Sequence, residues 1–208
     1  MTSTDPRPPA ANVPQGFSSL GAERMPLVPP QAMSPMQRDA ANALIAGPRK
    51  AVFGPFIALL RSPELMDRIG KVGEYLRFES MLEVRLRELV MCRVARQVCN
   101  QFEWLMHAPQ ALKAGVLQST LDAIAEGRQP RNMAADEAVV LAFTSELLQQ
   151  NGCCDTTYAE AVASLGEQGV VELTSLVGYF VMVCWVMNVA RTPAEGKAGF
   201  APLSAFPA

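Results

Sequence analysis

Acidic, basic and nucleophilic side chains recur along one segment, from Leu82 to His107 (LEVRLRELVMCRVARQVCNQFEWLMH). The pattern predicts one long helix, because apolar residues gather on one side at about 100° per residue. The chemically active side chains fall within roughly 100° on the other side. They are Arg85, Glu88, Cys92, Arg96, Cys99, Glu103 and His107. Two carboxylates and the only histidine of the chain are thus expected on one stripe.

Within this stripe, Glu103 and His107 stand four residues apart, close enough to touch across one helical turn. A carboxylate beside an imidazole raises the pKa of the histidine and fixes its tautomer, which a general acid/base at neutral pH needs. Two other interpretations stay open. The stripe could be a solvated face with weak ion pairs, or Glu88 could join the pair in holding a hard metal. The di-iron bundles, however, use Glu-x-x-His, whereas the spacing here is Glu-x-x-x-His.

The composition argues against several classes of protein. Lys and Arg number 18 against 20 Asp and Glu, so the chain lacks the basic surplus of a duplex-binding protein. Hydrophobic residues make up 50%, enough to build a core. A single histidine excludes His-rich metal sites, and the dinucleotide and P-loop glycine motifs are missing. We therefore expect no metal, no cofactor and no nucleic-acid partner.

The cysteines predict reduced thiols. Five occur, at positions 92, 99, 153, 154 and 184, and no Cys-x-x-Cys is present. An odd number with only one close pair, Cys153-Cys154, favours cytosolic thiols over a disulfide framework. The start of the sequence (MTSTDPRPPAANVP) has no apolar segment typical of a secretory signal. A cytoplasmic location is expected.

Breaker residues divide the body of the chain into helices, with little strand character. The strongest breaks are Gly47-Pro48, Ser62-Pro63, Pro109, Gly127 and Asn151-Gly152. The expected helices span 36–46, 50–60, 63–77, 82–107, 109–114, 118–126, 134–150, 156–166 and 169–190. An all-α bundle is predicted.

The two ends differ in composition from the body. Eight of the 16 prolines precede residue 36, so residues 1–23 are expected to form a flexible Pro-rich tail and 24–35 an extended arm. The folded domain is expected to span 24–192. Residues 193–208, again rich in Pro, Gly and Ala, are expected to lie over the surface as a C-terminal extension.

The final helix contains 18 consecutive uncharged residues, from Leu173 to Ala190 (LTSLVGYFVMVCWVMNVA). That length just suffices to span a membrane. Polar residues such as Thr174 and Asn188 dilute the run, and no polybasic flank fixes an orientation. The segment is therefore predicted to be a buried helix at the centre of a bundle or at a subunit interface, with a membrane span as the alternative.

Several motifs of the chain resemble those of the carboxymuconolactone decarboxylase family, which includes the alkyl hydroperoxidase D-type proteins. In the long segment they are the VRLREL run with Arg85, Arg87, Glu88 and Leu89, the Phe-Glu-Trp of 102–104, His107, and Ala111, Ala114 and Gly115. Further matches are GPR at 47–49, FGPF at 53–56, SPEL at 62–65, Gly178-Tyr179 and Asn188. The resemblance covers roughly residues 24–192 and implies an alkyl hydroperoxidase D-like helical bundle.

The chain departs from the hydroperoxidase branch at its redox centre. That motif runs glutamate, eleven residues, Cys-x-x-Cys, three residues, histidine, which places the glutamate at Glu88 and the histidine at His107. The two cysteine positions are occupied by Asn100 and Glu103. Cys99 lies one residue away from the first of them. A lone displaced thiol cannot run a dithiol/disulfide cycle.

The resemblance therefore implies the decarboxylase side of the family. The expected reaction is decarboxylation or isomerisation of a small carboxylated lactone or enone, of the kind met in aromatic compound catabolism. His107 is the candidate acid/base, Glu103 its partner, and Glu88 a supporting carboxylate or alternative base. Arg85 or Arg96 would anchor the anionic substrate by charge-assisted hydrogen bonds, and Trp104 would line an apolar pocket.

Two alternative functions stay open at this point. The first is a thiol-dependent peroxidase that uses Cys99, and the second is a non-enzymatic binding protein on the same fold. The resemblance also implies a homo-oligomer, a dimer, trimer or hexamer, because members of the family usually assemble through apolar helices. No membrane partner is expected.

Overall fold

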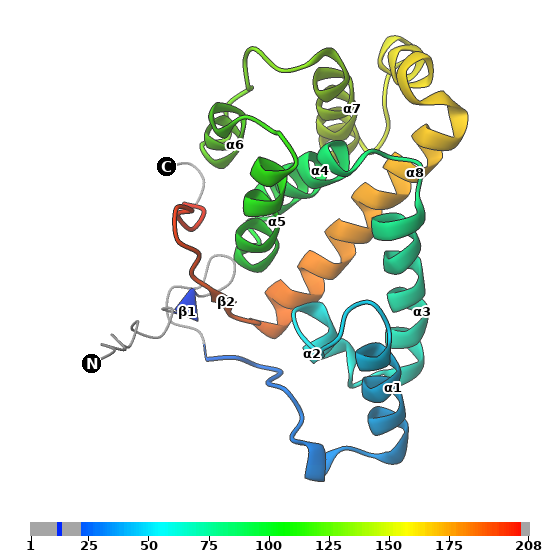
Figure 1. Cartoon of the computed structure of the whole chain (residues 1–208), viewed down its shortest axis with the longest axis vertical. Helices are drawn as coiled ribbons and strands as arrows, with labels where there is room; N and C mark the ends of the chain where they lie inside the picture. Colours follow the sequence, from blue (N-terminus) through cyan, green and yellow to red (C-terminus); the bar gives the residue numbers. More distant parts are fainter. Residues whose placement is uncertain (1–11, 14–21, 205–208) are drawn as a thin grey trace, which may run out of the picture.

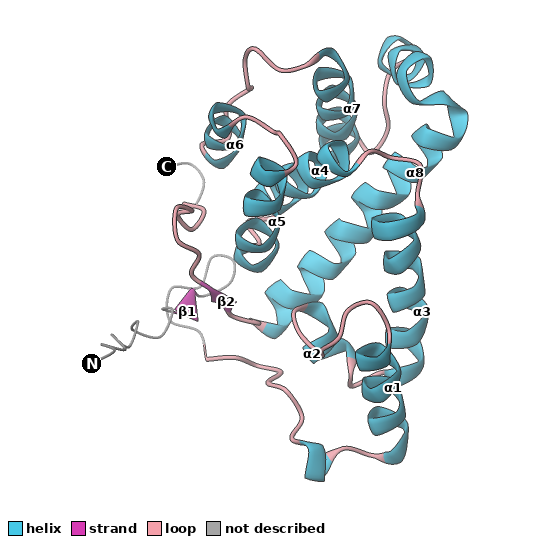
Figure 2. Cartoon of the chain, viewed as in Figure 1, coloured by secondary structure: helices cyan, strands magenta, loops and turns pink. Residues whose placement is uncertain are grey.

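The computed structural model describes residues 12–13 and 22–204, and there the chain is almost wholly helical (Figures 1 and 2). The predicted all-α class is confirmed. The α-helices of this part are α1 (Pro35–Ala46), α2 (Pro55–Leu59), α3 (Pro63–Glu74), α4 (Val84–Gln97), α5 (Gln101–Lys113), α6 (Gln118–Ala125), α7 (Ala135–Gln150) and α8 (Asp155–Ala190). A 3-10 turn, η1 (Pro30–Ala32), precedes α1, and a π-helical turn, η2 (Tyr75–Glu79), follows α3. The two-residue strands β1 (Asn12–Val13) and β2 (Ala194–Glu195) pair antiparallel.

Helix α4 is the centre of the bundle. It packs against α5, α7 and α8, while α1 and α3 lie together on the other side of α8 (Figure 1). The side chains that fill the interior are almost fully buried, among them Leu89, Val94, Leu105, Leu141 and Leu176. Burying one such side chain stabilises the fold by about 1.5–3 kcal/mol. The core therefore fixes how α4, α5 and α8 lie relative to one another.

The predicted helix over 82–107 was wrong, because the chain turns between α4 and α5. Helix α4 ends at Gln97, and Cys99 adopts a left-handed backbone with φ of 49°. Asn100 then begins α5 as its N-cap, and its side chain accepts a hydrogen bond from the Glu103 backbone N–H at 2.9 Å. Neither Gly nor Pro marks the turn, and its local sign in the sequence is Asn100 followed by Glu103 three residues later, a spacing typical of a helix start.

The predicted helix end before Pro109 was also wrong. Pro109 lies inside α5, which continues to Lys113. A proline within a helix removes one hydrogen bond, here the one its missing N–H would give to the Leu105 carbonyl. Leu105, Ala108 and Ala111 on this helix are buried. Tertiary packing therefore outweighs the local cost, and the separate helix expected over 109–114 is the last part of α5.

Helix α8 consists of two helical segments that meet at a non-helical residue, Gly166, so the expected break between 156–166 and 169–190 is present. It runs from Asp155 to Ala190, with a kink at Gly166 where φ is 70° and ψ is 171°. Among the described residues, α8 alone is long and apolar enough to cross a membrane, judged by length and composition only. Of its most apolar window, 56% is buried inside the molecule. The core helix of a bundle has the same length and composition, and a buried helix is what the sequence predicts for this segment.

Both ends of the described chain contact the bundle. The backbone N–H of Arg24 donates to the Ala190 carbonyl at 2.8 Å, so the arm over 24–35 starts at the end of α8. Residues 201–204 return over α4 and α5, where Leu203 exchanges two hydrogen bonds with the Gln101 side chain at 2.7 and 2.8 Å. The expected flexible tail over 1–23 lies mostly outside the described residues.

Candidate active site

Two carboxylates hold the only histidine of the chain from opposite sides. Nδ1 of His107 lies 2.7 Å from Oε2 of Glu88, and Nε2 lies 3.0 Å from Oε2 of Glu103. His107 and Glu103 come from α5, and Glu88 comes from α4. All three side chains are buried, and His107 is only 2% exposed. The solvated-face interpretation of this group of residues is therefore wrong.

The turn at Cys99 is what brings Glu88 to His107. The two residues are nineteen positions apart, and a straight α-helix would separate them by about 28 Å at 1.5 Å per residue. Because α5 folds back along α4, their side chains meet instead. The prediction that Glu88, Glu103 and His107 converge agrees with the structure, but its reason, one shared helical stripe, was wrong. Only Glu103 and His107 meet through helical spacing.

The position of His107 between Glu88 and Glu103 influences the protonation of its imidazole. Burial is the largest single influence on the pKa of His107 and lowers it, but hydrogen bonds and charge from Glu103 and Glu88 outweigh it, so the pKa lies above its ordinary value. An imidazole that bonds a carboxylate through each nitrogen must donate from both. The geometry therefore favours the cationic imidazole, whose two N–H groups are each shared with one carboxylate.

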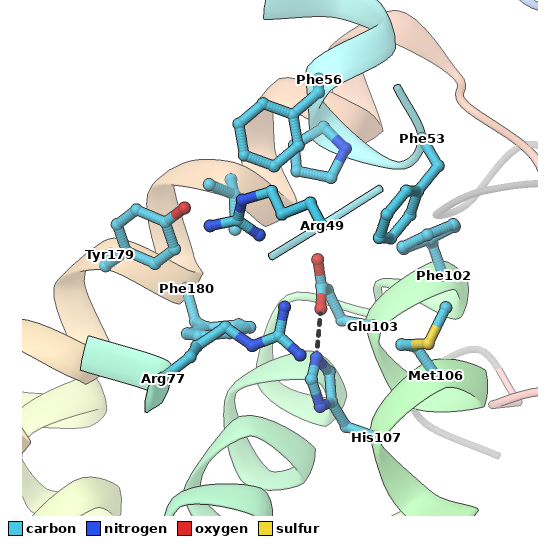
Figure 3. A pocket seen from close by; sticks show the side chains of 12 residues that line it. Arg49, Phe53, Phe56, Arg77, Phe102, Glu103, Met106, His107, Tyr179 and Phe180 are labelled. Atoms are coloured by element: carbon cyan, nitrogen blue, oxygen red, sulfur yellow. Dashed lines mark ion pairs between the residues drawn. The ribbon is translucent and has the colours of Figure 1, made fainter. Parts of the chain in front are cut away.

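A small cavity adjoins one end of this group. Its volume is about 50 Å³, and Glu103 and His107 line it, whereas Glu88 does not. The other lining residues are Arg49, Phe53, Pro55, Phe56, Arg77, Phe102, Met106, Tyr179, Phe180 and Val183. Figure 3 shows the Glu103 carboxylate pointing into this space together with the Arg49 and Arg77 side chains. The cavity thus combines a carboxylate that bonds the imidazole with two cationic groups.

The two arginines of the cavity differ in their surroundings. Nε of Arg49 lies 3.8 Å from Glu74, and its guanidinium stacks 4.4 Å from the Phe56 ring centroid. Burial lowers the pKa of Arg49. Among the described residues, Arg77 has no carboxylate within ion-pair distance, and its guanidinium lies 5.1 Å from the centroid of the Phe78 ring. Arg77 is thus the cation best able to accept an anionic ligand.

Tyr179 closes the same side of the cavity from α8. Its hydroxyl lies so close to the α3 backbone that a Cβ on Gly73 would meet it at 2.1 Å, so glycine is required at this position. Burial raises the pKa of Tyr179, with the charge of Glu103 adding to the effect and Arg49 opposing it. A neutral hydroxyl is the state in which Tyr179 can donate a hydrogen bond to a ligand.

The residues predicted to bind substrate lie elsewhere. Arg85 pairs with Asp136 and Glu137 at the start of α7, the latter at 2.7 Å. Arg96 donates to the Ser204 carbonyl at 2.7 Å, and Trp104 Nε1 donates to the Ala201 carbonyl at 3.0 Å. None of the three lines the cavity. The stripe was drawn on an unbroken helix, and these side chains instead hold α7 and the C-terminal segment.

Sequence reasoning overlooked the arginines and the tyrosine of the cavity. Arg49 lies in the GPR motif of 47–49, and Tyr179 follows Gly178, so both belonged to the family resemblance without a role being assigned. Arg77 lies in the π-helical turn η2, and no motif marks it. Their convergence depends on how α1, η2 and α8 pack.

The cysteines stand apart from the cavity. Cys99 is buried in the turn between α4 and α5 and does not line the cavity. Burial raises the pKa of its thiol, which the charge of Arg96 opposes, so the reactive thiolate is disfavoured. Of the two positions where hydroperoxidases carry cysteines, Asn100 is a helix cap and Glu103 bonds His107.

Comparison with known proteins finds a similar family. Residues 63–146 match the sequence model of the carboxymuconolactone decarboxylase family. This part of the chain is similar to that family. The carboxymuconolactone decarboxylase region includes Glu88, Glu103 and His107, whereas Arg49 and Tyr179 lie outside it. A comparison with the curated proteins finds no match.

A solved structure shares the fold of this chain. It is the crystal structure of a protein of unknown function from Agrobacterium tumefaciens, described there as a proposed antioxidant defence protein AhpD. The TM-score is 0.57 at 13% identity, and the match covers 67% of this chain and 96% of that one. At this identity the likeness establishes the fold, which is the predicted alkyl hydroperoxidase D-like bundle.

Proposed function

We propose that the chain is an acid/base enzyme that decarboxylates or isomerises a small carboxylated lactone or enone. The observation that carries the proposal is the buried Glu88–His107–Glu103 group, one carboxylate of which faces a cavity with two arginines. A buried, shared proton next to a cationic pocket suits the transfer of a proton to an anionic carbon substrate. The family to which residues 63–146 are similar is named for such a lactone.

In the proposed reaction, Arg77 and Arg49 bind the anionic end of the substrate. The bond between the substrate carbon and its carboxylate breaks, CO₂ leaves, and the electron pair passes into a dienolate. The arginines and the neutral Tyr179 hydroxyl stabilise this negative charge as it develops. Glu103, protonated through His107, then delivers a proton to carbon, and water returns a proton to the group. Glu88 holds the far side of the imidazole and acts as a positioning residue.

The proposal predicts lyase activity without thiol chemistry. The purified protein should release CO₂ from the lactone for which the family is named, or from a close carboxylated relative, as measured by coupled CO₂ detection. A Cys99→Ser variant should keep this rate within a few-fold, because Cys99 lies outside the cavity. Hydroperoxide turnover with a dithiol reductant should be near background. Robust peroxide reduction that Cys99→Ser abolishes would instead favour the thiol peroxidase.

We also propose that the protein is a homo-oligomer assembled through an apolar stripe on α8. Val171, Trp185 and Val189 are 64%, 60% and 57% exposed on this helix. Val171 also borders a groove with Val72 and Tyr75 of the α3–η2 segment. Single exposed apolar residues are common, but a row of this kind on a core helix is typical of an interface. The number of subunits, like the cytoplasmic location, stays a prediction.

The assembly proposal predicts a solution mass above the 22.5 kDa of one chain. Light scattering measures it directly. Trp185→Glu should reduce the mass to that of a monomer, because the charge would have to be buried at the interface. The matched control is Leu117→Glu, at the exposed N-cap residue of α6, which should leave the mass unchanged. A clean monomer for the unmodified protein would contradict the proposal, and partitioning into detergent would favour a membrane-bound helix.

A further inference from the structure

The cavity beside His107 is too small for a whole substrate. Its volume of about 50 Å³ would admit about four water molecules at 10–15 Å³ each. A carboxylate group fits such a space, but the remaining carbon atoms of a lactone do not. On the side away from Arg77 and Tyr179 in Figure 3, the cavity is bounded by Phe53, Phe102 and Met106. The rest of a bound molecule must therefore pass these three side chains.

A second pocket begins at the same three side chains. Phe53, Phe102 and Met106 line both spaces, and the outer pocket has a volume of about 300 Å³. Its other walls come from α2, α5 and the segment after α8, namely Gly54, Ile57, Leu105, Pro193, Ala194, Glu195 and Lys197. The lining is mostly apolar. Its two charged side chains, Glu195 and Lys197, are solvent-exposed and lie only 3.9 Å from each other.

The wall between the two pockets consists of the side chains of Phe53, Phe102 and Met106. The rings of Phe53 and Phe102 are tilted at 35° with centroids 6.3 Å apart, so they are not stacked face to face. Met106 has a flexible side chain that adapts to the shape of its neighbours. Gly54 has φ of +57°, and a Cβ there would meet the Phe102 ring at 2.7 Å. Glycine at this position therefore allows Phe102 to lie against the 53–55 loop.

We infer that the outer pocket binds the apolar part of an amphipathic carboxylate whose charged end enters the inner cavity. The inference rests on the proposed function for the place of the carboxylate, between Arg77 and Glu103. It adds a class of ligand, a monocarboxylate with a hydrocarbon body that spans both spaces past Phe102. Two observations point to this ligand. The two pockets share three side chains, and the inner one carries cationic groups while the outer one is mostly apolar.

The test is a chain-length series of straight-chain carboxylates, from acetate to decanoate, measured by isothermal titration calorimetry on the unmodified protein. Each added methylene that enters the outer pocket should raise the affinity up to about fourfold, until the pocket is full. The matching alcohols should bind more weakly at every length, because they lack the charge that Arg77 accepts. Affinity independent of chain length, or no binding at any length, would overturn the inference.

Two substitutions separate the pockets. Ile57→Phe should fill the outer pocket and flatten the chain-length dependence, while acetate binding stays the same. Ile45→Phe, at an exposed residue of α1 outside both pockets, is the matched control and should change neither. Arg77→Gln should weaken all lengths alike. Unaltered chain-length dependence in a folded Ile57→Phe protein would also overturn the inference. A normal series in a protein that turns over no lactone would contradict only the proposed function.

Discussion

Exchange of Glu103 for glutamine should lower turnover of a carboxylated lactone by about 10²–10⁴-fold, the usual cost of removing a positioned general acid/base. Glutamine keeps the shape of the side chain and its place at the start of α5, but it cannot carry a proton to the cavity. The substitution also removes one of the two charges that raise the pKa of His107. The acidic limb of the pH–rate profile should therefore shift to lower pH in any residual activity.

The matched control is Glu88→Gln. Glu88 bonds the same imidazole at 2.7 Å but does not line the cavity. Its loss should lower the pKa of His107 as well, yet reduce turnover far less than the loss of Glu103. Equal effects of the two substitutions would mean that the histidine, not Glu103, meets the substrate. Unchanged turnover in the Glu103→Gln protein would remove Glu103 from the mechanism.

Replacement of His107 by asparagine should destabilise the protein by about 3–5 kcal/mol near neutral pH, the range found when one partner of a buried ion pair is removed. Two buried carboxylates would then face each other without the imidazolium between them. Urea unfolding measures the difference. The sequence pattern places His107 at the end of the expected helix over 82–107. The structure places it in the middle of α5 and almost fully buried.

The pH dependence of this difference is a second readout of the same variant. The pKa of His107 is raised in the folded protein, so its charged form contributes stability below the unfolded value of about 6.5. That contribution is lost as pH rises through the folded-state pKa. The gap between the unmodified protein and His107→Asn should therefore narrow at alkaline pH. A gap that stays constant from pH 6 to pH 9 would show that His107 is not charged in the folded state.

Helix ends marked by strong breakers were predictable from the sequence. Ser34 caps α1, and the expected break at Ser62-Pro63 coincides with the start of α3. No strong breaker marks the turn at Cys99, and contacts with a remote residue add to the local cap at Asn100. Asn100 donates to the Asn188 side chain at 3.0 Å, and Asn188 donates to the Val98 carbonyl at 2.9 Å. These bonds join residues about ninety positions apart, which local patterns do not reveal.

Some contacts of the candidate site were likewise predictable from the sequence and others were not. The contact between Glu103 and His107 follows from helical spacing and is present in the structure. The contact of Glu88 with His107 needs the turn, and the approach of Arg49 and Tyr179 needs the packing of α1 and α8 around α3. Arg85 was assigned to substrate binding because its charge suited an anionic ligand, whereas in the structure it pairs with Asp136 at the start of α7, about fifty residues away. Spacing predicts contacts within one helix, and tertiary partners decide the rest.

The segment that covers α5 also constrains how the protein is made. Trp104 and Gln101 bond residues 97 and 102 positions later in the chain. At a synthesis rate of about 5–20 residues per second, α5 leaves the ribosome roughly 5–20 s before its cover exists. Meanwhile one face of the helix that carries Glu103 and His107 has no partner. Contacts of such long range slow folding, so the cover of α5 by residues 201–204 forms among the last steps of biosynthesis.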